Sequence, residues 1–183
     1  MKNKSLEKYL IYIGIPLICI LGVINHFVFD VIYNVPLVGI FFPTNESVWE
    51  HLKLSFYPII LIWIIGHFKF RKKLEYDPRR WFIAMVFTAV VSVIITIVMH
   101  YTAEGIFGKL KPVVDITIFI LSIAFSQNFG LWYYKNAHYS EQRYYFSIFL
   151  LVLFFTAFIL FTYYPPKIPL FYDTLNKKYG MVK

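Results

Sequence analysis

The 183-residue sequence contains one cysteine and few charged side chains. Iron–sulfur clusters, zinc fingers and disulfide frameworks each need several cysteines. Because Cys19 is the single cysteine, the sequence excludes all three classes. Gly-rich phosphate loops and the CxxCH and HExxH motifs are also absent, and the sequence therefore contains no nucleotide, flavin or haem signature. Because only 15% of the residues are charged, a soluble domain is not expected either.

Apolar residues make up 59% of the chain, and five apolar runs reach the roughly 20 residues that a membrane-spanning helix needs. We expect the spans at about Tyr9–Tyr33, Asn45–Phe70, Trp81–His100, Pro112–Tyr134 and Tyr144–Tyr164. The predicted fold is therefore all-α: a single five-helix transmembrane bundle over residues 1–183, in a multi-pass protein of the cell membrane.

Basic side chains flank these spans instead of forming one face, which favours contact with the lipid bilayer and its anionic headgroups over nucleic-acid binding. The N-terminus and the two loops on its side carry eleven Lys or Arg residues, whereas the opposite side carries six. The positive-inside rule then places the N-terminus in the cytoplasm and the C-terminus outside. The first apolar run lacks a small-residue cleavage site, so we expect it to remain as a signal-anchor helix.

Two further segments are apolar but interrupted by prolines. Residues 34–44, NVPLVGIFFPT, are too few to span a membrane, and we expect an interfacial or re-entrant loop there. The extracytoplasmic tail, about residues 165–183, begins with two prolines that end the last helix. We expect this tail to fold over the outer mouth and to bring Asp173 near the other polar groups, or else to anchor the C-terminus at the interface.

Ionisable side chains concentrate at the span ends that are predicted to face outward. Such groups are costly at membrane depth and usually mark a functional site. The candidates from four helix ends are Asn25, His26, Asp30, Asn45, Glu46, Glu50, His51, Lys53, His100, Glu104 and Asp115. The sequence therefore predicts one shared polar site that faces away from the cytoplasm.

Imidazoles and carboxylates are the ligands that zinc and other first-row divalent metals bind in proteins. We therefore expect a metal site with His26, His51 and His100 as ligands. The carboxylates that would complete the shell or act as general base are Glu46, Glu50 and Asp115. A metal lowers the pKa of its bound water to about 7, which suits hydrolysis or group transfer on a lipid-like or small-molecule substrate.

The same residues allow simpler structural explanations and two other functions. Ser47 and Glu50 have capping-box spacing, Glu50 and Lys53 can pair on one helix face, and Asp115 suits a first helical turn. A small transporter or ion pathway would use the carboxylates to carry a cation or protons. A non-catalytic accessory subunit would use the cluster only to lock the helices together.

Three segments, NHFVFD, PTNESVWEHLK and PPKIPLFYDTLNKKYG, resemble a family of small bacterial integral membrane proteins of unknown function. That family is recognised by a PxNESxWEHxK-like segment after the first helix and by a PLF-x-D run followed by Tyr-Gly. The resemblance covers nearly the whole chain and implies a small helical membrane protein without naming an activity. A looser similarity exists to membrane-embedded zinc hydrolases, although the chain lacks the HxxxH pattern that many of them carry.

Overall fold

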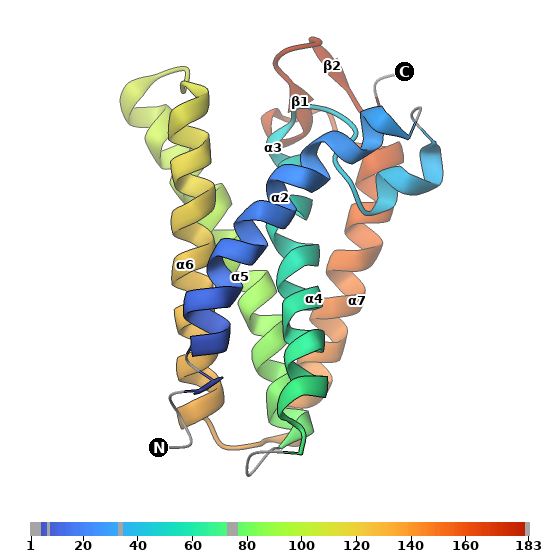
Figure 1. Cartoon of the computed structure of the whole chain (residues 1–183). Helices are drawn as coiled ribbons and strands as arrows, with labels where there is room; N and C mark the ends of the chain where they lie inside the picture. The colour runs from blue at the N-terminus through green and yellow to red at the C-terminus, as the bar shows by residue number, and fades with distance from the viewer. Residues whose placement is uncertain (1–4, 7, 33–34, 73–76, 182–183) are drawn as a thin grey trace.

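The computed structural model describes residues 5–6, 8–32, 35–72 and 77–181. Within these ranges a π-helical turn, Lys8–Ile13, leads into the first of five long helices: α2 (Gly14–Val31), α4 (Lys53–Phe70), α5 (Pro78–Phe107), α6 (Pro112–Asn136) and α7 (Glu141–Tyr163). The shorter elements are two 3₁₀ turns (Pro36–Ile40 and Pro169–Phe171), α3 (Val48–His51) and the antiparallel strands β1 (Tyr172–Asp173) and β2 (Lys178–Tyr179). Figure 1 shows that α3, the β1–β2 hairpin and the C-terminus lie at one end of the bundle.

Five stretches of the described residues are long and apolar enough to cross a membrane: Lys8–Phe29, Val48–Phe70, Pro78–Phe107, Pro112–Asn136 and Glu141–Tyr163. The prediction of five such helices is confirmed, and they suit a multi-pass membrane protein. The bounds differ most in α5, which continues about two turns beyond His100 to Phe107. The β1–β2 hairpin could not be predicted from the sequence, because its two-residue strands are too short to leave a pattern.

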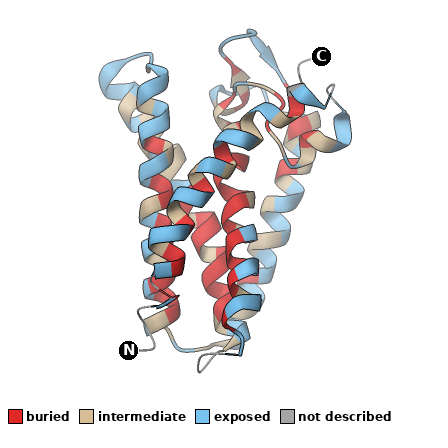
Figure 2. Ribbon diagram, in the orientation of Figure 1, coloured by how far each residue is buried: buried red, intermediate tan, exposed pale blue. Residues whose placement is uncertain are grey.

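The centre of the bundle is formed by α4 and α5 (Figure 2). Their most apolar stretches are 61% and 50% buried, against 17% for the first and the last span. Trp63 and Trp81 lie side by side in this core, with ring centroids 4.7 Å apart. The indole of Trp63 donates to Gln127 Oε1 at 2.8 Å, and that of Trp81 donates to the Trp63 carbonyl at 3.0 Å. Both buried N–H groups therefore have acceptors.

Small residues set the spacing of two helix pairs. Gly130 of α6 packs so closely on α5 that a Cβ there would collide with the Thr88 hydroxyl. In α4, Pro58 has no N–H to donate to the Leu54 carbonyl. Gly22 of α2 lies against that carbonyl, where a Cβ would stand only 3.0 Å away. Glycine thus permits the close approach of α2 to α4 and of α5 to α6.

Candidate metal centre

The NESVWEH segment makes a capped turn before the chain enters α4. The Ser47 hydroxyl accepts the Glu50 N–H at 3.3 Å, and the Ser47 N–H donates to Asn45 Oδ1 at 2.8 Å. The first of these bonds is one half of a capping box, whereas the Glu50 carboxylate binds elsewhere. The turn leaves His51 partly exposed and Glu50 buried.

Three predicted site residues meet beside α3. His26 comes from α2, Glu46 from the loop before α3, and His51 from the end of α3. The two Nε2 atoms lie 3.2 Å apart, and Glu46 Oε2 lies 3.3 Å from Nε2 of His51 and 3.7 Å from Nε2 of His26. All three ligand atoms fall within 4.8 Å of one another. The side chains are 30–39% exposed, so a ligand can reach them.

The surroundings of His26, Glu46 and His51 affect which of their atoms could bind a metal. The Ser47 carbonyl accepts from Nδ1 of His51 at 2.8 Å, which leaves the lone pair of His51 on Nε2, facing the other two residues. Nδ1 of His26 is buried and has no hydrogen-bond partner among the described residues. The imidazoles of His26 and His51 hold the pKa of the Glu46 carboxyl well below its usual value. The group therefore presents an ionised carboxylate and two imidazole nitrogens to one point.

Glu50 and Lys53 form a buried ion pair, with exposed fractions of 2% and 0% for their side chains. The Lys53 ammonium donates to Glu50 Oε2 at 2.7 Å, to the Gly39 carbonyl at 2.7 Å and to the Thr162 hydroxyl at 2.6 Å. Thr44 donates to Glu50 Oε2 through its N–H at 2.9 Å and through its hydroxyl at 3.1 Å. The pair thus ties the 3₁₀ loop and α7 to the start of α4.

The C-terminal hairpin docks on the loop that carries Glu46. Asn45 Nδ2 donates to the Gly180 carbonyl at 2.8 Å, and the Glu46 N–H donates to Asp173 Oδ2 at 3.3 Å. Burial alone would raise the pKa of Asp173, but hydrogen bonds from the side chain and backbone of Asn176 and from the Glu46 N–H hold it below its usual value. Asp173 therefore supports the backbone of Glu46 and the turn of the hairpin.

His100 and Asp115 form a separate pair between α5 and α6, with His100 Nδ1 2.8 Å from Asp115 Oδ1. Neither belongs to the group of His26, Glu46 and His51, within which all ligand atoms are close. Figure 1 shows why: the ends of α5 and α6 that carry this pair spread away from α3 and the hairpin. The structure therefore does not bring all the predicted ligands to one point.

The remaining candidates lie around the group of His26, Glu46 and His51 or beyond it. Asn25 precedes His26 in α2 and is half-buried, and Asp30 lies in the last turn of α2 with its side chain outside the described residues. Glu104 is exposed on α5, one turn after His100, and does not join the three-residue group.

Three partners of the buried ion pair were not among the predicted site residues: Gly39, Thr44 and Thr162. Thr44 directly precedes the NESVWEH segment, and that position could have indicated a role. Thr162 lies 109 residues after Lys53, within an apolar helix. No signal in the sequence links those two positions.

Comparisons with known proteins give a family but no activity. No curated protein matches the chain, and neither does any solved structure. A family model matches residues 1–181, and its description is a family of unknown function. The chain therefore belongs to the family of unknown function DUF6512.

Proposed function

We propose that this chain is a multi-pass membrane protein, with its N-terminus in the cytoplasm, whose outward-facing group of His26, Glu46 and His51 binds a divalent metal such as zinc. With the metal bound, the site catalyses hydrolysis or group transfer on a lipid-like substrate. The observation that carries the proposal is the approach of three ligand atoms to within 4.8 Å of one another.

The donor set suits zinc in both chemistry and spacing. Two histidines and one glutamate are a known set of catalytic zinc ligands, which leaves a fourth position for water or substrate. Bonds of roughly 2.0–2.1 Å at tetrahedral angles place ligand atoms about 3.3 Å apart. The three separations here are 3.2, 3.3 and 3.7 Å. Small side-chain adjustments would therefore complete the site.

The surroundings of the group favour a substrate with an apolar part. Val23, Ile24 and Phe27 of α2 are 54–60% exposed, and in a membrane such side chains contact acyl chains. The ring of Phe27 lies 5.0 Å from that of His26. A lipid lying along α2 would thus bring its polar part to the metal group.

Each residue has a role that its contacts support. A bound zinc ion supplies Lewis-acid chemistry and a water of lowered pKa. His26 and His51 would hold it through Nε2, and the Ser47 carbonyl keeps His51 in the required tautomer. Glu46, a carboxylate 3.3 Å from Nε2 of His51, would serve as third ligand or as proton acceptor.

A transport pathway draws less support from the same contacts. Glu50 and Lys53 neutralise each other instead of offering a cation site. Deeper in the bundle, Ser55 and Ser92 hydrogen-bond at 3.2 Å, and Gln127 accepts from a buried indole. These polar groups hold neighbouring helices together through hydrogen bonds. The accessory-subunit hypothesis assigns that role to the whole set of polar candidates.

Metal analysis of the purified full chain tests the site. We expect stoichiometric metal in the wild type, loss of most of it in His26→Ala and His51→Ala, and retention in His100→Ala. The last variant is a matched control, because His100 lies outside the group. Unchanged metal content in His26→Ala and His51→Ala would refute the assignment.

A second measurement tests catalysis. Purified protein is incubated with a panel of fluorescent phospholipids, and release of headgroup or acyl chain is followed. We expect turnover that disappears in Glu46→Gln and persists in His100→Ala. Stoichiometric metal without turnover of any lipid in the panel would retain the metal site and reject the enzymatic part.

A further inference from the structure

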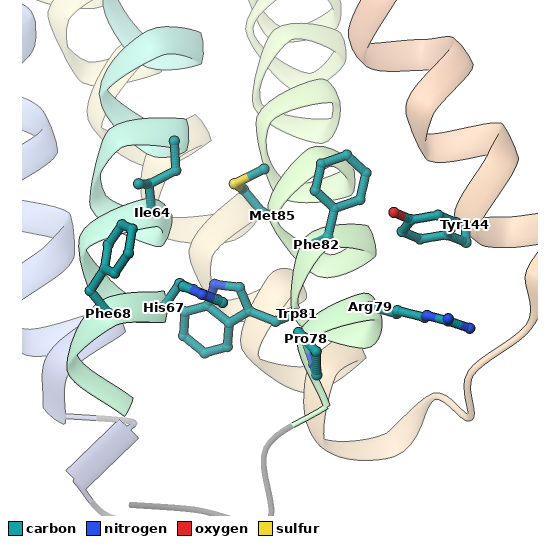
Figure 3. Close-up of a pocket in the computed structure, with 9 residues that line it drawn as sticks. All are labelled: Ile64, His67, Phe68, Pro78, Arg79, Trp81, Phe82, Met85 and Tyr144. Atoms are coloured by element: carbon teal, nitrogen blue, oxygen red, sulfur yellow. The ribbon is translucent and has the colours of Figure 1, made fainter. Parts of the chain in front are cut away.

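A pocket of about 320 Å³ opens at the end of the bundle opposite α3 and the group of His26, Glu46 and His51. It lies between the last turns of α4 and the first turns of α5 and α7, as Figure 3 shows. The side chains that carry the argument are Ile64, Phe68, Arg79, Phe82, Met85 and Tyr144. The volume falls at the low end of the roughly 300–1,000 Å³ of ligand pockets.

Apart from His67 and Arg79, the residues that line the pocket are apolar or aromatic, and those of α4 turn outward from the bundle. Ile64 and Phe68 of α4 are 42% and 61% exposed, and Phe82 and Met85 of α5 form the apolar surface facing them across the pocket. In a membrane, exposed apolar side chains near a helix end contact the part of the acyl chains closest to the headgroups. Aromatic residues such as Tyr144 are typical of that depth. The pocket therefore suits a hydrocarbon chain that enters from the bilayer.

The side chain of Arg79 places a positive charge at the rim of the pocket. The Arg79 guanidinium donates to the Tyr139 hydroxyl at 3.3 Å and lies 5.5 Å from the centre of the Tyr139 ring. A guanidinium carries five N–H donors in a planar fork that matches phosphate, and the bond to Tyr139 uses one of them. The Asp77 carboxylate accepts the backbone N–H groups of Arg79 and Arg80, so it is engaged in capping α5.

More positive charge lies near the rim. Arg71 and Lys72 follow α4 and are exposed, and Arg80 occupies the first turn of α5 beside Arg79. Glu141, in the first turn of α7, is the acidic neighbour on the side of Tyr144. Among the residues that the structure describes at this end, cationic side chains outnumber acidic ones, which favours an anionic headgroup.

We propose that this pocket binds one anionic phospholipid, with an acyl chain between α4, α5 and α7 and the phosphate at Arg79. The assignment concerns a different end of the molecule from the metal group and does not depend on it. Clusters of basic residues between membrane helices attract anionic headgroups, and here an apolar pocket adjoins one.

Lipid retention by the purified full chain, read by native mass spectrometry, tests this inference. The protein is offered phosphatidylglycerol or phosphatidylcholine with identical acyl chains. We expect a preference for phosphatidylglycerol that falls about fivefold in Arg79→Gln, as the loss of one cation near a headgroup implies. Ile64→Trp fills the pocket, and we expect it to reduce the retention of both lipids.

Two controls make the result decisive. Arg143→Gln removes a cation from the same end, where Arg143 donates to the His138 carbonyl outside the pocket lining, and should leave the preference unchanged. Inorganic phosphate should not displace the lipid, because it lacks the acyl chain. Equal preference in the wild type and Arg79→Gln, an equal loss in Arg143→Gln, or displacement by phosphate alone would overturn the proposal.

Discussion

Replacing Lys53 by methionine tests the buried ion pair most directly. The ammonium is fully buried and reaches Glu50, the Gly39 carbonyl and the Thr162 hydroxyl at 2.6–2.7 Å. Methionine is similar in length but supplies no charge and no donor. It would leave the Glu50 carboxylate, 2% exposed, without a counter-charge.

The expected loss is large because an unpaired buried charge costs more than its pair contributes. Removal of one partner from a buried pair typically destabilises a protein by about 3–5 kcal/mol. Thr44 and Thr162 still donate to the carboxylate, which places the expected value toward the lower end of that range, at about 3 kcal/mol.

Equilibrium unfolding in mixed detergent micelles measures this loss. Lys109→Met is the matched control, because Lys109 is exposed, and it should change the free energy of unfolding by no more than about 0.5 kcal/mol. The double variant Glu50→Gln, Lys53→Met should lose less than the sum of the two single variants, since the two residues contact each other. A Lys53→Met variant that unfolds within about 1 kcal/mol of Lys109→Met would refute the reasoning.

Three further substitutions have expected outcomes. Asp173→Ala removes the acceptor of the Glu46 N–H and should speed amide exchange across residues 168–181; unchanged exchange there would show that the hairpin is held by other contacts. Gln127→Leu leaves the Trp63 indole N–H buried without its acceptor, and it should cost about 1–3 kcal/mol of unfolding free energy. Gly130→Val drives a side chain into α5 and should cost about 1–3 kcal/mol, whereas an unaffected variant would mean that α5 and α6 can separate freely.

The five spans could be predicted from the sequence because hydrophobic length is a local property. Each apolar run is recognisable without reference to any other part of the chain. The extension of α5 to Phe107 could not be predicted in the same way, because Glu104 and Gly105 interrupt the apolar run. The helical hydrogen bonds nevertheless continue, and the last of them runs from the Gly108 N–H to the Glu104 carbonyl.

The candidate site could be predicted only in part, because it depends on which helix ends lie together. His26, Glu46 and His51 come from α2, the long loop after it and α3, and no local pattern shows where such a loop folds. His100 and Asp115 lie on either side of the short connection between α5 and α6, which pairs them with each other. That short connection is a local property of the sequence, and it favours a separate His100–Asp115 pair over one shared site.

Glu50 shows a different limit of sequence reasoning. Its spacing from His51 made it a plausible base, and its spacing from Lys53 made it a plausible partner of that lysine. Burial of both charged groups decides in favour of the ion pair, and the pair hydrogen-bonds to Thr162, far along the chain.

The bonds of Thr162 to both members of the ion pair bear on the order in which the fold is completed. When ribosomal synthesis delivers α4, α7 does not yet exist, and Glu50 and Lys53, an acid and a base one turn apart, can already neutralise each other. The loop before α3 acquires its final anchor only once the last span arrives. Completion of the end of the molecule that carries α3 is thereby coupled to completion of the chain.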